Sequence, residues 1–203
     1  MGRIDAIGES MAKAQALGSV EIPSLEGKVG ADEWKVRVDL AAAYRLVAHY
    51  GWDDLIFTHL SARVPGPEHH FLLNPYNLMF EEVTASSLVK VDMSGNPVGE
   101  TPFITNAAGF TIHSALHMAR EDAQAVMHLH TPHGQAVSAH AEGLLPLTQT
   151  AMLIREDVAY HGYEGVAVDL DERERLIADI GDKGAMLPRN HGTLTVGETV
   201  GEA

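Results

Sequence analysis

Apolar residues recur at helical spacing in several stretches of the chain. Between Asp32 and Tyr50 they fall mostly three or four positions apart, and Gly51 follows as a stop signal. This pattern predicts a helix over residues 32–50. Similar spacing predicts a helix over residues 106–120. Pro132 suits the first turn of a short helix over residues 131–139, and a further helix is expected over residues 171–180. Asn106 is a suitable N-cap for the first of these, because its side chain can accept a hydrogen bond from a free backbone N–H.

Shorter segments with alternating or continuous apolar character predict the strands of a sheet. They cover residues 55–64, 71–74, 88–92, 126–130, 185–187 and 193–196. PGPEHH forms a turn between the first two of them, and MSGNPVGE after residue 92 is a tight surface connection. Several connections are short enough for hairpins. Because helices alternate with strands and several connections are tight, the chain is predicted to form an α/β sandwich with a mixed sheet.

The length of 203 residues suits one domain with a substantial core and is too short for two comfortable ones. Residues 1–30 are a mixture of small and polar positions, so we expect a flexible N-terminal arm followed by one domain over residues 31–203. The sequence stops at VGETVGEA, directly after the last predicted strand. Either a partner covers that strand or the polypeptide is shortened there.

Charge and composition restrict the function classes. Fourteen Lys and Arg against 28 Asp and Glu give a net charge of −14, which repels nucleic acids and anionic membranes. No stretch is long and apolar enough for a membrane span or a signal core, so we expect a cytoplasmic protein without nucleic-acid or membrane partners. The chain has no cysteine, so any metal must be bound by nitrogen and oxygen ligands.

Three histidines are the candidate metal ligands: His128 and His130 in AVMHLHTPHG, and His191 in RNHGTLTVG. In a strand, His128 and His130 share one face and lie roughly 6.6 Å apart, at a rise of about 3.3 Å per residue. Both imidazoles can then converge on one cation, and His191 can complete the set and leave positions open for a substrate. Spacing alone leaves open an ordinary hydrogen-bonded pair, because HxH is common in a chain with twelve histidines.

Five longer motifs together carry a resemblance to a known family: RVDLAAAYRLVAHYGW, THLSARVPGPEHHFLLNPYNLMFEEVTASSLVKVD, TNAAGFTIHSALHMAR, AVMHLHTPHG and NHGTLTVG. From about residue 33 to residue 196, the chain resembles the class II aldolase/adducin domain. The resemblance implies a class II aldolase-like α/β/α sandwich with a mixed, largely antiparallel central sheet. It also implies a homo-oligomer, since members with this fold commonly form cyclic tetramers.

The same resemblance implies a resident metal. In members that are sugar-phosphate aldolases or epimerases, histidines at the positions of His128, His130 and His191 bind zinc or manganese. We therefore expect a divalent ion, Zn²⁺ first, with Mn²⁺ or Fe²⁺ also suited to three histidines and open positions. The implied chemistry uses the ion as a Lewis acid on two adjacent substrate oxygens while a carbon–carbon bond breaks.

The sequence departs from the aldolases at the residues that carry protons and phosphate. Their proton carrier is a glutamate nineteen residues before the first histidine ligand, and that position here is Gly109. Thr58 and His59 replace a Gly-Asn pair, and Ala107 and Ala108 replace small hydroxyl residues. Each lost charge-assisted hydrogen bond weakens phosphate binding by about 1.5–3 kcal/mol. The chain therefore resembles the adducin-like branch, and a phosphorylated sugar is not the expected substrate.

Four other polar residues are candidates for the site. His113 lies four residues after Gly109 on the same helix face and is the candidate acid or base, the alternative being a hydrogen-bonded residue paired with His117. His59 and Asn74 fall in the substrate loops implied by the resemblance and are candidate substrate contacts. His133 follows the HxH pair and is a candidate for the rim of the pocket.

Two function classes remain open from the sequence. One is a metal-dependent lyase, or a related decarboxylase, isomerase or oxygenase, acting on a small non-phosphorylated hydroxy-carbonyl compound or keto-acid. Intact metal ligands favour it, because three clustered imidazoles are costly unless something satisfies them. The other is a non-catalytic adducin-like module with an assembly or cytoskeletal role, which Gly109 favours.

Overall fold

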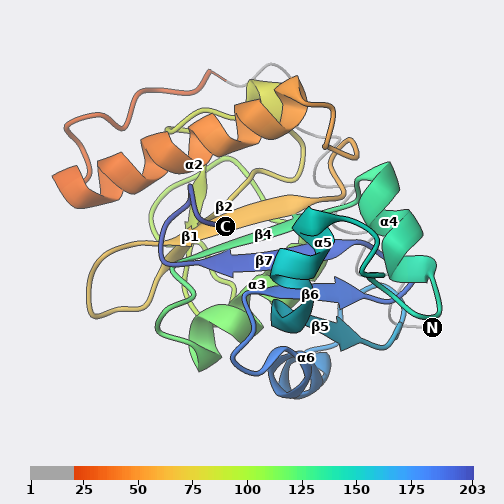
Figure 1. The fold of residues 1–203 in the computed structure, drawn as a ribbon. Helices are drawn as coiled ribbons and strands as arrows, with labels where there is room; N and C mark the ends of the chain where they lie inside the picture. Colours follow the sequence, from red (N-terminus) through yellow and green to blue (C-terminus); the bar gives the residue numbers. More distant parts are fainter. Residues whose placement is uncertain (1–20) are drawn as a thin grey trace.

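The computed structural model describes residues 21–203, within which seven strands form one sheet (Figure 1). The strands are β1 (His59–Arg63), β2 (Phe71–Leu73), β3 (Val89–Val91), β4 (Ala125–Leu129), β5 (Val158–His161), β6 (Ala185–Pro188) and β7 (Thr193–Gly197). They lie in the order β3-β2-β1-β4-β7-β6-β5, and only β5 and β6 pair in parallel. The predicted mixed, largely antiparallel sheet is therefore confirmed.

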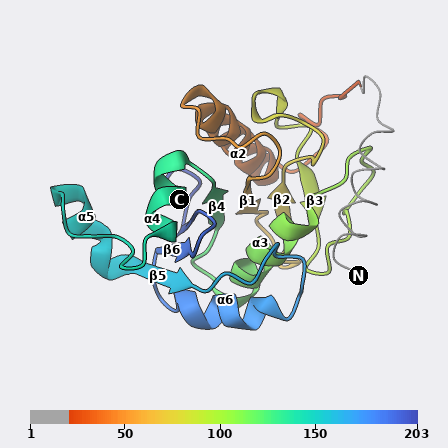
Figure 2. The same ribbon diagram turned by 90° about the vertical axis from the view of Figure 1, so that its right-hand side faces the viewer.

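The helices are α2 (Ala31–His49), α3 (Ala107–Ala119), α4 (Pro132–Ala139), α5 (Gln149–Ile154) and α6 (Glu172–Ile180), with short 3-10 turns η1 (Phe80–Glu82) and η2 (Arg155–Asp157). Helix α2 covers one face of the sheet, and α3 and α6 cover the opposite face (Figure 2). The predicted cap is present, since the Asn106 side chain accepts from the backbone N–H of Ala108. In residues 21–203, no helix has the length and apolar character that crossing a bilayer requires.

The structure corrects three details of the predicted elements. Residues 55–58 do not continue the strand predicted over 55–64; they form a turn in which Leu55 has a φ of 55°. Strand β5 was not predicted, because four residues are too few for periodicity to separate a strand from a loop. His130 also lies one residue beyond the end of β4 rather than inside it.

Alternation along β1 and β4 sends successive side chains to opposite faces of the sheet. Leu60 and Leu129 pack on the α2 side in one apolar cluster, whereas Val126 packs with α3 and α6 in another. His59 pairs with His128 across the two strands, so both imidazoles project toward the α3 side. The antiparallel register thus brings histidines 69 positions apart onto one face.

The predicted arm over residues 1–30 is only partly within the described chain, because residues 1–20 lie outside it. Of the rest, Ile22 packs against the apolar cluster around β2 and β3. The backbone N–H of Leu25 donates to the Ser86 hydroxyl at 3.0 Å. Ile22 and Leu25 therefore contact the domain, and the flexible arm over residues 1–30 stays a prediction.

Candidate metal centre

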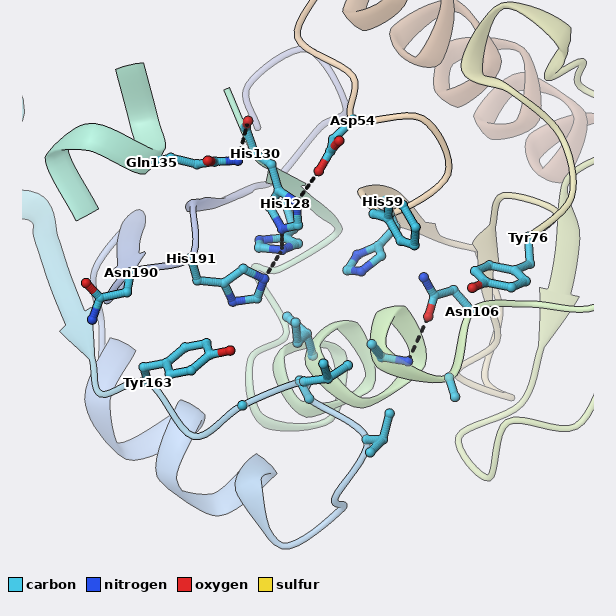
Figure 3. A pocket seen from close by; sticks show the side chains of 18 residues that line it. Asp54, His59, Tyr76, Asn106, His128, His130, Gln135, Tyr163, Asn190 and His191 are labelled. Carbon is cyan, nitrogen blue, oxygen red and sulfur yellow. Dashed lines mark hydrogen bonds and ion pairs between the residues drawn. The ribbon is translucent and has the colours of Figure 1, made fainter. Parts of the chain in front are cut away.

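The three predicted metal ligands meet at one point (Figure 3). His128 comes from β4, His130 follows it directly, and His191 lies in the turn between β6 and β7. Nε2 of His128 lies 3.0 Å from Nε2 of His130 and 3.2 Å from Nε2 of His191. In a tetrahedral zinc site with Zn–N bonds of about 2.0–2.1 Å, ligand nitrogens are about 3.3 Å apart. The spacing of the three nitrogens fits a bound divalent ion.

The other ring nitrogens fix how these imidazoles carry their protons. Nδ1 of His128 lies 3.0 Å from the carbonyl oxygen of Thr193, and Nδ1 of His130 lies 2.9 Å from Oδ2 of Asp54. Both oxygens accept, so both Nδ1 atoms carry the hydrogen and both Nε2 atoms point lone pairs at each other. Two acceptors at 3.0 Å repel unless a proton or a cation lies between them, and hydrogen-bonded Nδ1 is typical of metal-ligating histidine.

Burial keeps the imidazoles of His128 and His191 neutral. It lowers the pKa of His128 well below its usual value, and the neighbouring histidines lower it further. Burial, followed by the nearby His130, lowers the pKa of His191 to about 4. Neutral imidazole is the form that binds a metal, so near neutral pH these two rings need not release a proton first.

Gly192 allows the third ligand to reach the other two. A Cβ atom at this position would collide with the carbonyl oxygen of Leu129 at the end of β4. Only glycine therefore lets the turn that carries His191 approach β4 so closely. This contact gives the HG motif a structural reason.

Asp54 is expected to strengthen metal binding through His130. Changing Asp54 to Ala removes the acceptor at Nδ1, so we expect zinc affinity to fall about 10- to 100-fold, which isothermal titration calorimetry measures. Asp53→Ala is the matched control, since Asp53 lines a separate shallow hollow beside α2. Equal affinity in both variants would show that the Asp54 contact does not support the metal.

A cavity of about 390 Å³ opens beside the three imidazoles, a size suited to a small molecule. Its polar walls come from the histidines, Asp54, Gln135, Asn190 and Asn106, with Tyr76 and Tyr163 at the sides (Figure 3). Its apolar walls are Phe57, Ile112 and the segment 165–168 with residues 107 and 108. Among the described residues, neither lysine nor arginine lines it.

The ring of His59 occupies the space beside Gly109. A Cβ atom at Gly109 would lie 2.9 Å from both Cγ and Cδ2 of His59, closer than real Cβ contacts. His59 also lines the cavity. At the position where the resemblance implies a glutamate in the aldolases, an imidazole from β1 therefore fills the space.

The other predicted site residues lie away from the cavity. His113 is fully buried behind His59, with Nε2 at 2.8 Å from Nδ1 of His59, so it does not reach the space beside Gly109. Asn74 is buried, and its Oδ1 lies 2.9 Å from the hydroxyl of Tyr44. His133 is exposed and lines a different hollow near the start of α4.

Two residues that hydrogen-bond to histidines of the site, Asp54 and Ser61, were not predicted from the sequence. Asp54 is 76 positions from His130, and only the turn before β1 brings them together. Ser61 binds both His113 and His117. The alternation of His59 with Ser61 and the four-residue spacing of His113 with His117 are the signals that could have indicated two facing polar rows.

The description of the family model that matches this chain is the class II aldolase and adducin N-terminal domain, and the match covers residues 38–203. The chain belongs to this family. The predicted resemblance to the class II aldolase/adducin domain is thereby confirmed, and both aldolase-type proteins and adducins are relatives.

Three matches show the range of relatives of this family member. It is 63% identical over 185 residues to a protein of Caulobacter vibrioides named for aldolase class 2, covering 91% of this chain and 72% of that one. It is 48% identical over 171 residues to alpha-adducin of Rattus norvegicus, covering 83% of this chain but 23% of the adducin. The solved L-fuculose 1-phosphate aldolase of Glaciozyma antarctica is 33% identical with a TM-score of 0.75, covering 93% and 71% of the two chains.

Proposed function

We propose that this chain is a divalent-metal-dependent enzyme of the lyase type. Its substrate is a small, non-phosphorylated hydroxy-carbonyl compound or keto-acid that binds a metal through two oxygens. One observation carries the proposal: three Nε2 atoms converge at the wall of a cavity, and hydrogen bonds at Nδ1 turn the lone pairs of His128 and His130 inward.

The residues of this chain have two roles at such a site, metal binding and formation of an apolar wall. His128, His130 and His191 hold the ion, Zn²⁺ being the best match to their spacing. When bound, a divalent ion acts as a Lewis acid that withdraws electron density from substrate oxygens. Phe57 and Ile112 form part of the apolar wall of the cavity, and an apolar wall strengthens polar interactions beside it.

The lining of the cavity supports a substrate without phosphate. A phosphate dianion needs several charged donors, and among the described residues lysine and arginine are absent from the lining. Residues 107 and 108 at the N-terminus of α3 do line it. The partial positive charge of a helix N-terminus suits a single carboxylate or carbonyl oxygen.

A second candidate function is a non-catalytic binding module, as in the adducin branch. Two observations favour it: the 48% identity to alpha-adducin and the imidazole that fills the place of the aldolase glutamate. In that case the metal, if present, has a structural role.

We also propose that the chain self-associates. Large apolar side chains are exposed around α5 and its preceding loop: Leu147, Met152, Leu153 and Ile154. Exposed apolar groups gathered in one region are typical of interfaces. A homo-oligomer would cover them.

A paired activity assay tests the proposed function. Zinc-loaded protein is incubated with dihydroxyacetone, dihydroxyacetone phosphate and a panel of hydroxy- and keto-acids, and NMR follows carbon–carbon cleavage, isomerisation or decarboxylation. We expect turnover of a non-phosphorylated compound and none of its phosphate. Failure to bind zinc at micromolar concentration would refute the metal-dependent reading. Zinc binding without turnover of any compound would favour the binding module.

A further inference from the structure

A second group of histidines lies directly behind the metal centre. His59, His113 and His117, together with Ser61, are each at most 1% exposed. Nδ1 of His59 lies 2.8 Å from Nε2 of His113, whose Nδ1 lies 2.5 Å from the Ser61 hydroxyl. That hydroxyl lies 2.7 Å from Nε2 of His117. The four side chains form one hydrogen-bonded row between β1 and α3.

The hydrogen bonds of the row all run in one direction, because the last acceptor is a backbone carbonyl oxygen. Nδ1 of His117 lies 2.8 Å from the backbone oxygen of Ala123, which can only accept, so Nδ1 carries the hydrogen. Nε2 of a neutral His117 then accepts from the Ser61 hydroxyl. The Ser61 oxygen must in turn accept from Nδ1–H of His113.

The hydrogen positions of His113 and His59, nearer the cavity, follow from those of His117 and Ser61. With its hydrogen on Nδ1, His113 presents a lone pair at Nε2 and accepts from Nδ1–H of His59. His59 is left with an Nε2 lone pair. Every hydrogen in the row is assigned by the carbonyl of Ala123, more than 60 positions from His59.

Burial supports the neutral state of all three rings. It lowers the pKa of His117 to about 3 and the pKa of His113 well below the usual value. Among the described residues, no carboxylate contacts the row. A neutral row keeps the direction described above.

The free nitrogen of His59 faces the space a substrate would enter. His59 lines the cavity, and its Nε2 forms no hydrogen bond within residues 21–203. This nitrogen is not one of the fully buried polar atoms that lack a partner. Its ring packs on His128, with the two centroids 5.0 Å apart. The acceptor therefore lies beside the metal ligands, not in the core.

We propose that His59 is a specificity-determining residue that accepts a hydrogen bond from a substrate hydroxyl and discriminates against a carbonyl in the same place. A substrate hydroxyl can donate a hydrogen bond to the Nε2 lone pair of His59. A carbonyl oxygen in the same place is itself an acceptor, so the two lone pairs repel each other. This inference rests on the proposed function and narrows its substrate class to compounds with a hydroxyl beside the chelating carboxylate or carbonyl. Ser61, His113 and His117 are positioning residues that act through His59.

The hydrogen positions are measurable without any substrate. In ¹⁵N NMR spectra of histidine-labelled protein, metal-free and zinc-loaded, we expect His59, His113 and His117 all with the hydrogen on Nδ1. That tautomer is the minor one for free imidazole in water, so three such rings would not arise by chance. A hydrogen on Nε2 of His59 would overturn the proposal, whatever the protein does with zinc.

Selectivity is tested with a matched pair of ligands. Calorimetry of zinc-loaded protein is expected to show about tenfold tighter binding of lactate than of pyruvate. The hydroxyl of lactate gains a hydrogen bond to His59, whereas the carbonyl of pyruvate is repelled by it. Ser61→Ala breaks the row and should bring the ratio close to one while zinc affinity stays unchanged. Ser114→Ala is the control, because Ser114 is equally buried on α3 but, within residues 21–203, its hydroxyl hydrogen-bonds only to the carbonyl oxygen of Thr111 in its own helix.

The outcomes separate this inference from the proposed function. Equal binding of lactate and pyruvate by the unaltered, zinc-loaded protein would refute the selectivity of His59 and leave the metal site intact. Absence of zinc binding would refute the metal-dependent function, while the NMR result would still decide the direction of the row. If Ser61→Ala does not fold, the NMR spectra and the ligand ratio of the unaltered protein still decide the inference.

Discussion

Replacing His128 by alanine is expected to abolish micromolar zinc binding, with a loss of affinity of about 100-fold or more. Of the three ligands, His128 has the closest approach to both others, at 3.0 Å and 3.2 Å between Nε2 atoms. Loss of an outer hydrogen-bond partner alone costs about 10- to 100-fold, so loss of a ligand costs at least as much. Calorimetric titration with zinc, and metal content after purification, measure the effect.

His133→Ala is the control for this experiment. His133 is exposed and lines a separate hollow near Trp52, so its loss should leave zinc affinity unchanged. An equal loss in both variants would mean that zinc binds at surface histidines and not at the convergent site. Retention of full affinity by His128→Ala would contradict the assignment of the metal centre directly.

Restoring the aldolase glutamate by Gly109→Glu alone is expected to destabilise the protein by about 1–2 kcal/mol and to yield no aldol cleavage. A Cβ at this position lies 2.9 Å from the His59 ring, which the row behind it holds in place. Overpacking of this kind costs about 1–3 kcal/mol, more than the 0.5–1 kcal/mol gained by removing a helical glycine. Urea denaturation measures the free energy of unfolding.

The double variant His59→Asn with Gly109→Glu should recover at least half of that loss. Asparagine has no ring in the crowded space, and by the sequence resemblance it stands at this position in the aldolases. The new carboxylate then lies beside the metal ligands, and a screen of simple aldols tests whether cleavage appears. Gly30→Glu is the control, because no atom lies within 4 Å of a Cβ at Gly30. A single variant as stable as the unaltered protein would contradict the steric argument.

Most elements of the fold were predictable from local patterns. The helix predicted over 32–50 is α2, and the one predicted over 106–120 is α3 with its Asn106 cap. Such elements are encoded by side chains within one turn of each other. Residues 55–58 and β5 were not predicted correctly, since a turn at Leu55 and a four-residue strand leave too little periodic signal.

The sequence by itself indicated the candidate metal ligands and determined the missing carboxylate at Gly109. His128 and His130 are two positions apart in a strand, and His191 precedes a glycine that its turn requires. The local backbone conformation sets where the side chains of such motifs point, so these motifs can be recognised from a few neighbouring residues. Gly109 likewise excludes a proton carrier at that position whatever the rest of the chain does.

Only the tertiary structure decided what surrounds the ligands. Asp54 meets His130 across 76 positions, and β1 brings His59 against Gly109 through its register with β4. The row from Ala123 to His59 needs a strand, a helix and a loop at fixed separation, and no sequence spacing encodes those distances. Hydrogen bonds between distant segments depend on packing, and packing is a property of the whole folded chain.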